Sequence, residues 1–251
     1  MSYNKFIILV LVLSLPFVFF TCKESHPITS PVEEEEMTQG QIDSLLDKFK
    51  FFYEQPIVID SSSHIIIPIS TRLIERKSIY SKDGYASDSY PRYWNALFYN
   101  RETSASRLLS KRKIRISRIH AKGNNGFREE NKTFGEMVLY EMGDIDYNKD
   151  GKLDNKDPEF LFSSKQDGMG LKRITPKDES LKYFQIIKNT NQILIKTLRD
   201  INSDLIFDQA DEPIWYKAEL RGETWDLHEV IDSTRRNEIK NLYFEQWLKG
   251  S

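Results

Sequence analysis

The sequence predicts a mainly β protein made of antiparallel, propeller-like or sandwich-like repeats, with short N- and C-terminal helices. Three observations lead to this prediction. Many segments between residues 57 and 231 are short, β-branched or aromatic, and often alternate between apolar and polar positions. Glycine-, asparagine- and aspartate-containing turns separate these segments. An acidic pattern that begins at Asp146 also returns at Asp200.

The expected elements follow one another along the chain. Apolar residues at helical spacing predict an amphipathic helix over residues 41–53. Strands are expected at 57–60, 64–70, 93–100, 113–119, 136–142, 159–164, 181–188, 192–198, 213–220 and 225–231. Helical spacing returns at Ile239, Leu242, Tyr243 and Trp247, which predicts a second helix over residues 233–248.

The acidic pattern belongs to an internal repeat. The shift that places residues 146–157 on residues 200–211 also places Gly168 on Gly222. Residues 159–176, EFLFSSKQDGMGLKRITP, resemble the strand–turn–strand segment of TolB-like propeller repeats. This resemblance implies blade-sized units at about 57–112, 113–176 and 181–231. Three units are too few for a closed propeller, so we expect an incomplete propeller or an open sandwich.

Composition excludes several classes of protein. The chain has 251 residues, a net charge of -2 and one cysteine. The charge balance argues against a strongly basic, nucleic-acid-binding protein. A single cysteine excludes an intramolecular disulfide framework and a cysteine-rich zinc site.

The N-terminus has the pattern of an export signal. Residues 1–21 contain an apolar run, Phe6–Phe20, which is short for a membrane span and suits a signal peptide. Cys22 follows this run, and the arrangement resembles the lipoprotein signal of Bacteroidetes-like bacteria. The resemblance implies a lipidated Cys22 and attachment to a cell-envelope membrane (outer membrane, periplasmic or surface-exposed). Ordinary secretion and an uncleaved anchor are the alternatives. Residues 22–41, which include Glu33–Glu36, then form a flexible acidic linker to a folded domain over residues 42–251.

The first acidic loop, residues 146–157, has the spacing of a calcium site. Calcium prefers six to eight oxygen ligands, and alternate side chains of a tight loop can point at one centre. The ligands expected are Asp146, Asn148, Asp150, the carbonyl of Lys152, Asp154 and Asp157. This pattern resembles the loops of EF-hand and dockerin proteins, although Pro158 and the strand-like residues after it depart from both. A metal-free turn is the alternative.

The second loop, residues 200–211, repeats this pattern. Its expected ligands are Asp200, Asn202, Asp204, the carbonyl of Ile206, Asp208 and Asp211. Leu205 stands where the first loop has Gly151. If this position needs positive φ, leucine costs about 1 kcal/mol there, so we expect weaker binding or a decayed copy.

Other candidate sites are weaker. The four histidines are scattered and form no ligand pair; they are His26, His64, His120 and His228. Three glutamates could in principle serve glycoside hydrolysis, namely Glu129, Glu130 and Glu136. The basic segment 107–122 could be a solvated edge or could contact an anionic partner, and the tyrosine-rich loop 80–94 could stack on sugars or on a protein.

These observations favour a non-enzymatic binding or scaffold module of the cell envelope, stabilised by calcium. The expected partners are the membrane, through the lipid anchor, and a protein or glycan. The alternative is a surface carbohydrate-binding or carbohydrate-handling protein, and a hydrolase with an unrecognised site is a weaker possibility.

Overall fold

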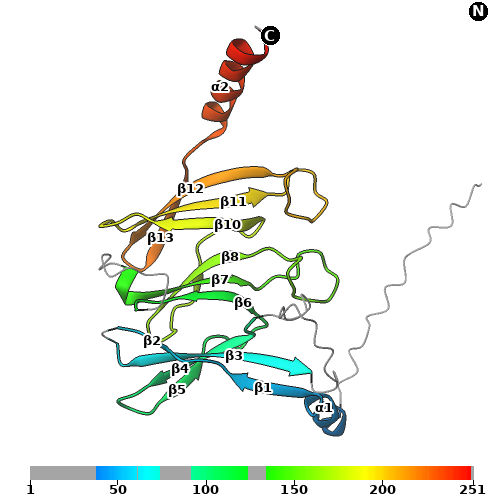
Figure 1. The fold of residues 1–251 in the computed structure, drawn as a ribbon, viewed down its shortest axis with the longest axis vertical. Coiled ribbons are helices and arrows are strands. Elements are labelled where there is room, and N and C mark those ends of the chain that lie inside the picture. The colour runs from blue at the N-terminus through cyan, green and yellow to red at the C-terminus, as the bar shows by residue number, and fades with distance from the viewer. Residues whose placement is uncertain (1–37, 61, 74–91, 124–133, 250–251) are drawn as a thin grey trace, which may run out of the picture. The chain divides into compact units, whose positions relative to one another are not determined.

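The computed structural model describes residues 38–60, 62–73, 92–123 and 134–249 (Figure 1). Residues Gly40–Ser251 form one compact unit. The described residues form three antiparallel sheets and two helices, which confirms the mainly β prediction. The predicted signal peptide (1–21), Cys22 and most of the linker lie outside the described residues.

The first sheet has the strand order β1-β3-β4-β5, and β2 also pairs with β3. Its strands are β1 (Phe49–Tyr53), β2 (Ile57–Val58), β3 (His64–Leu73), β4 (Asn95–Asn100) and β5 (Ser106–Leu108). In the central pair, Ile66 lies opposite Phe98 and Ile67 lies opposite Leu97. Because successive side chains of a strand point to opposite faces, Ile66 and Phe98 share the face that is buried in the protein core.

The second and third sheets repeat the same four-stranded meander. The second consists of β6 (Arg115–His120), β7 (Met137–Gly143), β8 (Phe160–Lys165) and β9 (Lys172–Arg173), with the 3₁₀ turn η1 (Phe134–Glu136) before β7. The third consists of β10 (Glu179–Ile186), β11 (Gln192–Arg199), β12 (Glu212–Arg221) and β13 (Thr224–Glu229). The first sheet begins earlier than the predicted unit 57–112, because it includes β1.

Two hydrophobic cores join the three sheets. The first core contains residues of the first and second sheets, such as Phe98 and Tyr140. The second core contains residues of the second and third sheets, such as Leu139 and Ile193. Tyr140 and Leu139 are neighbours on β7 and enter different cores. The second sheet is therefore covered on both faces, which explains why β7 and β8 are almost continuously buried.

The prediction of a helix over residues 41–53 is only half right. The helix α1 covers Gln39–Leu46, and residues Phe49–Tyr53 form the strand β1. The aromatic-rich sequence FKFFY suits a strand, and its pairing with β3 places Phe51 opposite Thr71. All the predicted strand segments contain a strand, whereas β1, β5 and β9 were not predicted.

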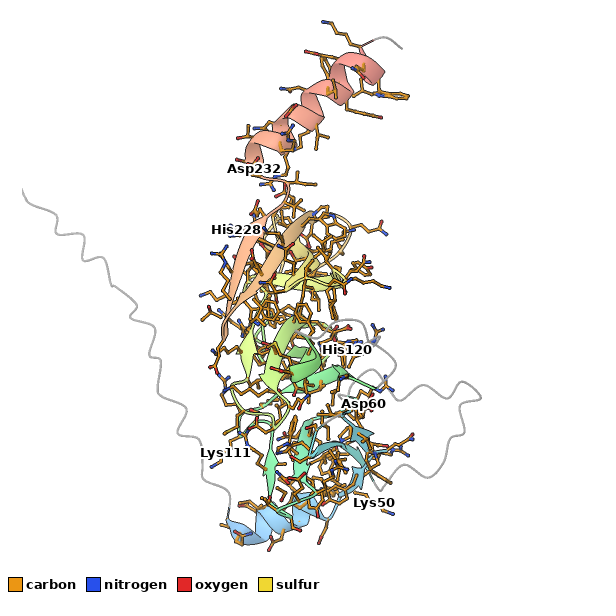
Figure 2. All side chains as sticks on the ribbon, turned by 90° about the vertical axis from the view of Figure 1, so that its left-hand side faces the viewer. Lys50, Asp60, Lys111, His120, His228 and Asp232 are labelled. Carbon is orange, nitrogen blue, oxygen red and sulfur yellow. The ribbon has the colours of Figure 1, made fainter. Side chains whose placement is uncertain are left out.

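The C-terminal helical prediction is confirmed by α2 (Ser233–Tyr243) and the π-helical turn η2 (Phe244–Leu248). The helix starts at its N-cap Asp232, whose carboxylate accepts the backbone N–H of Arg235 at 2.8 Å (Figure 2). None of the helices described here is long and apolar enough to cross a membrane.

Candidate metal sites

The two acidic loops occupy equivalent places in the fold. Residues 146–157 lie between β7 and β8, the second and third strands of the second sheet. Residues 200–211 lie between β11 and β12, the second and third strands of the third sheet. The turns that follow the third strands contain Gly168 and Gly222, with φ values of +76° and +62°. The repeat in the sequence is therefore a repeat of structure.

The side chains of the first loop cap its own backbone. The N–H of Gly151 donates to Oδ2 of Asp146 at 2.8 Å. The N–H of Asp150 donates to Oδ1 of Asn148 at 3.0 Å, and the N–H of Lys152 donates to Oδ1 of Asp150 at 2.9 Å. These bonds hold residues 146–152 in a tight turn in which alternate side chains accept backbone N–H groups.

The end of the first loop is buried and held by one carboxylate. Asp157 accepts the N–H of Tyr147 at 2.8 Å with one oxygen and the N–H of Asp154 at 3.0 Å with the other. Asp157 and Asp154 are both buried, and Leu153 immediately before Asp154 is buried as well. The Asp157 carboxylate thus joins the first residues of the loop to its last.

The second loop has the same hydrogen bonds at the equivalent residues. Asp200 accepts the N–H of Leu205 at 3.1 Å, and Asp211 accepts the N–H groups of Ile201 at 3.3 Å and Asp208 at 3.0 Å. The N–H of Asp204 donates to Oδ1 of Asn202, and the N–H of Ile206 donates to Oδ1 of Asp204. The two loops therefore share one conformation.

That conformation places Leu205 in the left-handed region. Its φ is +65°, compared with +83° at Gly151. Two residues earlier in each loop, Ser203 and Lys149 also have matching φ values, +60° and +58°. A leucine at positive φ costs about 1 kcal/mol relative to glycine, so the second loop carries strain that the first avoids.

The two loops touch through their aromatic residues. The rings of Tyr147 and Phe207 lie 5.1 Å apart between centroids. Burial raises the pKa of Tyr147, and the negative charge of Asp200 in the second loop raises it further. Lys182 donates to the carbonyl oxygen of Phe207 at 3.2 Å, and burial lowers the pKa of this lysine. Each loop therefore lies within electrostatic reach of the other.

The donor chemistry of both loops suits a hard cation. Every side chain in the two predicted ligand sets offers oxygen, and neither set contains a nitrogen or sulfur ligand. The carboxylates are directed at backbone N–H groups, and the described residues include no group of three or more His, Cys, Asp or Glu side chains arranged to hold a metal ion. The ligand types fit calcium, but the side chains are arranged as caps of the loop backbone.

Two basic residues of the segment 107–122 have acidic partners, whereas its residues 111–113 are exposed. Arg115 is buried and forms an ion pair with Glu159 at 3.1 Å. Arg118 lies 3.4 Å from Glu141, which also contacts His120 at 2.9 Å. The expected alternation of basic and apolar residues is interrupted by an irregularity between Ile116 and Arg118.

The remaining candidates separate. His64, His120 and His228 lie on β3, β6 and β13, so the described histidines belong to different sheets. Figure 2 shows His120 and His228 well apart. Glu129, Glu130 and residues 80–91 of the tyrosine-rich loop lie outside the described residues, as does His26. Glu136 is exposed in the turn before β7.

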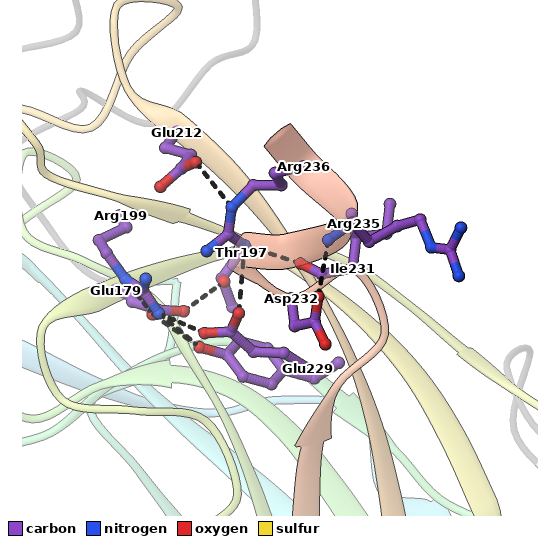
Figure 3. A network of polar contacts seen from close by, with 10 residues as sticks. Glu179, Thr197, Arg199, Glu212, Glu229, Ile231, Asp232, Arg235 and Arg236 are labelled. Atoms are coloured by element: carbon purple, nitrogen blue, oxygen red, sulfur yellow. Dashed lines mark hydrogen bonds and ion pairs between the residues drawn. The ribbon is translucent and has the colours of Figure 1, made fainter. Parts of the chain in front are cut away.

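Sequence reasoning missed a polar network in the third sheet (Figure 3). Glu179 is 1% exposed. Its carboxylate accepts hydrogen bonds from the hydroxyl of Thr197 at 2.5 Å, from Nε of Arg199 at 2.8 Å and from the hydroxyl of Tyr216 at 2.8 Å. Burial raises the pKa of Tyr216, and so does its hydrogen bond to Glu179. The only signal in the sequence is Thr197, which follows Ile193 and Ile195 in the alternating apolar series of β11. The fully paired Glu179 carboxylate indicates a structural role.

The network continues to the C-terminal helix. Arg199 lies 3.0 Å from Glu229, and Glu229 lies 3.1 Å from Arg236 of α2 (Figure 3). Arg236 also contacts Glu212 at 3.2 Å and donates to the carbonyl oxygen of Ile231 at 2.7 Å. One arginine therefore holds the start of α2 against the third sheet.

No known protein family matches this chain, and no curated protein is similar to it in sequence.

Proposed function

We propose that the protein is a non-enzymatic binding or scaffold module of the cell envelope, tethered through Cys22, whose two acidic loops bind calcium. The observation that carries the calcium proposal is the shared loop conformation. The same hydrogen bonds recur at Asp146 and Asp200 and at Asp157 and Asp211, and Leu205 accepts a positive φ to preserve them. Conservation of a strained conformation within one chain suggests that the loops share a ligand.

The residues that would hold the ion are those of the two spaced sets. In the first loop they are Asp146, Asn148, Asp150, the carbonyl of Lys152, Asp154 and Asp157. In the second they are Asp200, Asn202, Asp204, the carbonyl of Ile206, Asp208 and Asp211. Bound calcium would cancel the mutual repulsion of these carboxylates. The carboxylates cap backbone N–H groups, and no three of the described acidic side chains are placed to hold an ion together, so binding would require these side chains to turn towards one centre.

The role proposed for the ions is structural. Both loops join the central strands of their sheets, and the loops contact each other through Tyr147 and Phe207. Stiffening the loops would therefore fix the second and third sheets relative to each other. The envelope location is supported by the sequence alone, through the apolar run before Cys22.

Calorimetric titration of residues 23–251 with calcium chloride tests the proposal. We expect one equivalent of calcium at the first loop, a second and weaker one at the loop that contains Leu205, and a melting temperature that falls on addition of chelator. Ligand at a hundred times its Kd stabilises a folded protein by about 2.7 kcal/mol. The variants Asp150→Asn and Asp204→Asn should each remove one equivalent. The control Asp167→Asn changes a partly buried aspartate in a turn outside both loops, and it should bind as the wild type does.

Each outcome has a clear meaning. Binding of one equivalent that Asp150→Asn abolishes would show that only the first loop is active, with Leu205 as the reason. No heat of binding and no change in melting temperature would refute the calcium proposal and leave two metal-free capped turns.

A further inference from the structure

The first sheet has one face that belongs to neither core. Its strand register places Val58 opposite Ile65, Ile65 opposite Tyr99, and Ile67 opposite Leu97, which in turn lies opposite Leu108. These six residues alternate with Ile66 and Phe98, which are buried in the first core. They therefore lie on the opposite face, which we call the outer face of the first sheet.

This outer face is apolar, and part of it is accessible to solvent, whereas Ile69 and Asn95 at one end of it are 5% and 3% exposed. Val58 is 58% exposed and Leu108 is 41% exposed. Ile65, Ile67 and Leu97 are only partly buried. The other described strand positions with the same orientation carry aromatic, aliphatic, hydroxyl or amide side chains, and none is charged. In a protein with 29% charged residues, such a face is unusual for a solvated surface.

The third sheet shows what a solvated outer face looks like in the same protein. Its inward residues, such as Ile193 and Ile195, are in the second core. Its outward neighbours include Lys196, opposite Trp215, and Lys217, opposite Leu194. Antiparallel sheets that face water on one side carry charged and polar residues there. The outer face of the first sheet lacks this protection, so we expect another surface to cover it.

We propose that the outer face of the first sheet is the site at which a second copy of this chain packs, with the same face of each copy in contact across a two-fold axis. An uncharged, pleated apolar face is complementary to itself, because pairing leaves no charge desolvated and unpartnered. Face-to-face packing of sheets is also how the opposite side of this sheet meets the second sheet, in the first core.

The size of the face is adequate for a dimer. The four strands across the face, β1, β3, β4 and β5, contain 5, 10, 6 and 3 residues, an average of six. At about 4.8 Å between strands and about 3.3 Å per residue, they give a footprint of about 20 Å by 20 Å. The accessible area of a pleated surface exceeds its footprint, and a standard interface buries about 800 Å² per partner. The face therefore lies towards the small end of stable interfaces, and we expect a dimer whose population depends on concentration.

Sedimentation equilibrium of residues 23–251 tests this proposal, since they retain every described strand and omit Cys22. We expect the wild type to approach twice the monomer mass as its concentration rises. The double variant Val58→Lys/Leu108→Lys should be monomeric. Both side chains are already exposed in the monomer, so its melting temperature should stay close to that of the wild-type monomer.

A matched control places the same change on the third sheet. Tyr183 is 49% exposed and Val230 is 52% exposed, and Val230 continues from β13 with its N–H donating to Trp215. The variant Tyr183→Lys/Val230→Lys should remain dimeric. High salt should not dissociate the dimer, because the interface has no charge to screen.

Three results would overturn the proposal. The first is a wild-type protein that stays monomeric up to its solubility limit. If that monomer floats with phosphatidylcholine vesicles, lipid is the occupant of the face. The second is a dimer that survives Val58→Lys/Leu108→Lys with an intact circular dichroism spectrum. The third is loss of the dimer in the control variant, which would place the partner's third sheet at the interface.

Discussion

Two equivalent glycines allow the steric and conformational costs of one substitution to be separated. Gly168 in the β8–β9 turn has a φ of +76°, and Gly222 in the β12–β13 turn has a φ of +62°. A Cβ on Gly168 would lie 2.6 Å from Cδ2 of Phe98, whereas a Cβ on Gly222 would have no heavy atom within 4 Å. Phe98 is 1% exposed in the first core, so its ring has no open space to move into.

The expected magnitudes follow from this difference. Alanine in the left-handed region costs about 1–2 kcal/mol in both turns. Overpacking against a buried ring adds about 1–3 kcal/mol at Gly168 only. Reduced freedom of the unfolded chain favours alanine equally in both variants and cancels in their comparison. Gly168→Ala should therefore lower the free energy of unfolding by about 1–3 kcal/mol more than Gly222→Ala does.

Equilibrium urea unfolding of the two variants and the wild type measures this difference directly. Equal losses of stability in the two variants, with unchanged m values, would refute the reasoning, because they would mean that the Phe98 ring does not confine the turn. A larger loss for Gly222→Ala would show that the two turns are not equivalent.

Three further predictions concern charged groups. Asp157→Asn should destabilise the protein by about 1–3 kcal/mol in urea unfolding, because an amide has one acceptor oxygen for the two N–H groups that this buried carboxylate binds; the exposed Asp150→Asn should cost far less, and equal costs would contradict the capping role. Hydrogen bonds from two arginines hold the pKa of Glu229 below its ordinary value. The contribution of Glu229 to stability is therefore present above its unfolded pKa of about 4.3 and is lost as pH falls. The urea midpoint of Glu229→Gln should fall less on acidification than that of the wild type, and parallel pH profiles would contradict this. Arg236→Ala should speed hydrogen exchange at the start of α2, whereas Arg235→Ala, which removes an exposed pair, should change it little; identical exchange in the two variants would show that the ion pairs of α2 with the third sheet do not hold it.

The sequence predicted the strands well where alternation was regular or the apolar run was continuous. It also predicted the repeat, because acidic loops and turn glycines have local requirements that the residues themselves display. Residues 49–53 were assigned to a helix, since Phe49 and Phe52 fit helical spacing as well as they fit a strand. Only the pairing of this segment with β3 decides between the two.

The basic strand and the polar network show a different limit. Arg115 and Glu159 are distant in the sequence and meet because β6 lies in the same sheet as β7 and β8. Glu179 and Arg199 meet across β10 and β11, where their register places them directly opposite each other. Patterns of charge along one strand do not reveal partners on another, so the burial of Arg115 within the basic segment 107–122 was not predicted.

The sequence by itself determined the mainly β class, the repeat that relates residues 146–157 to residues 200–211, and the oxygen-rich side chains of the two loops, because each of these depends on neighbours in the chain. The tertiary structure decided which residues share a face. It buried the basic residue Arg115, paired Glu179 completely, and brought Tyr147 against Phe207. It also left Val58 and Leu108 exposed on the uncharged outer face of the first sheet. Register and sheet packing, which join residues far apart in the chain, are the physical reason for that division.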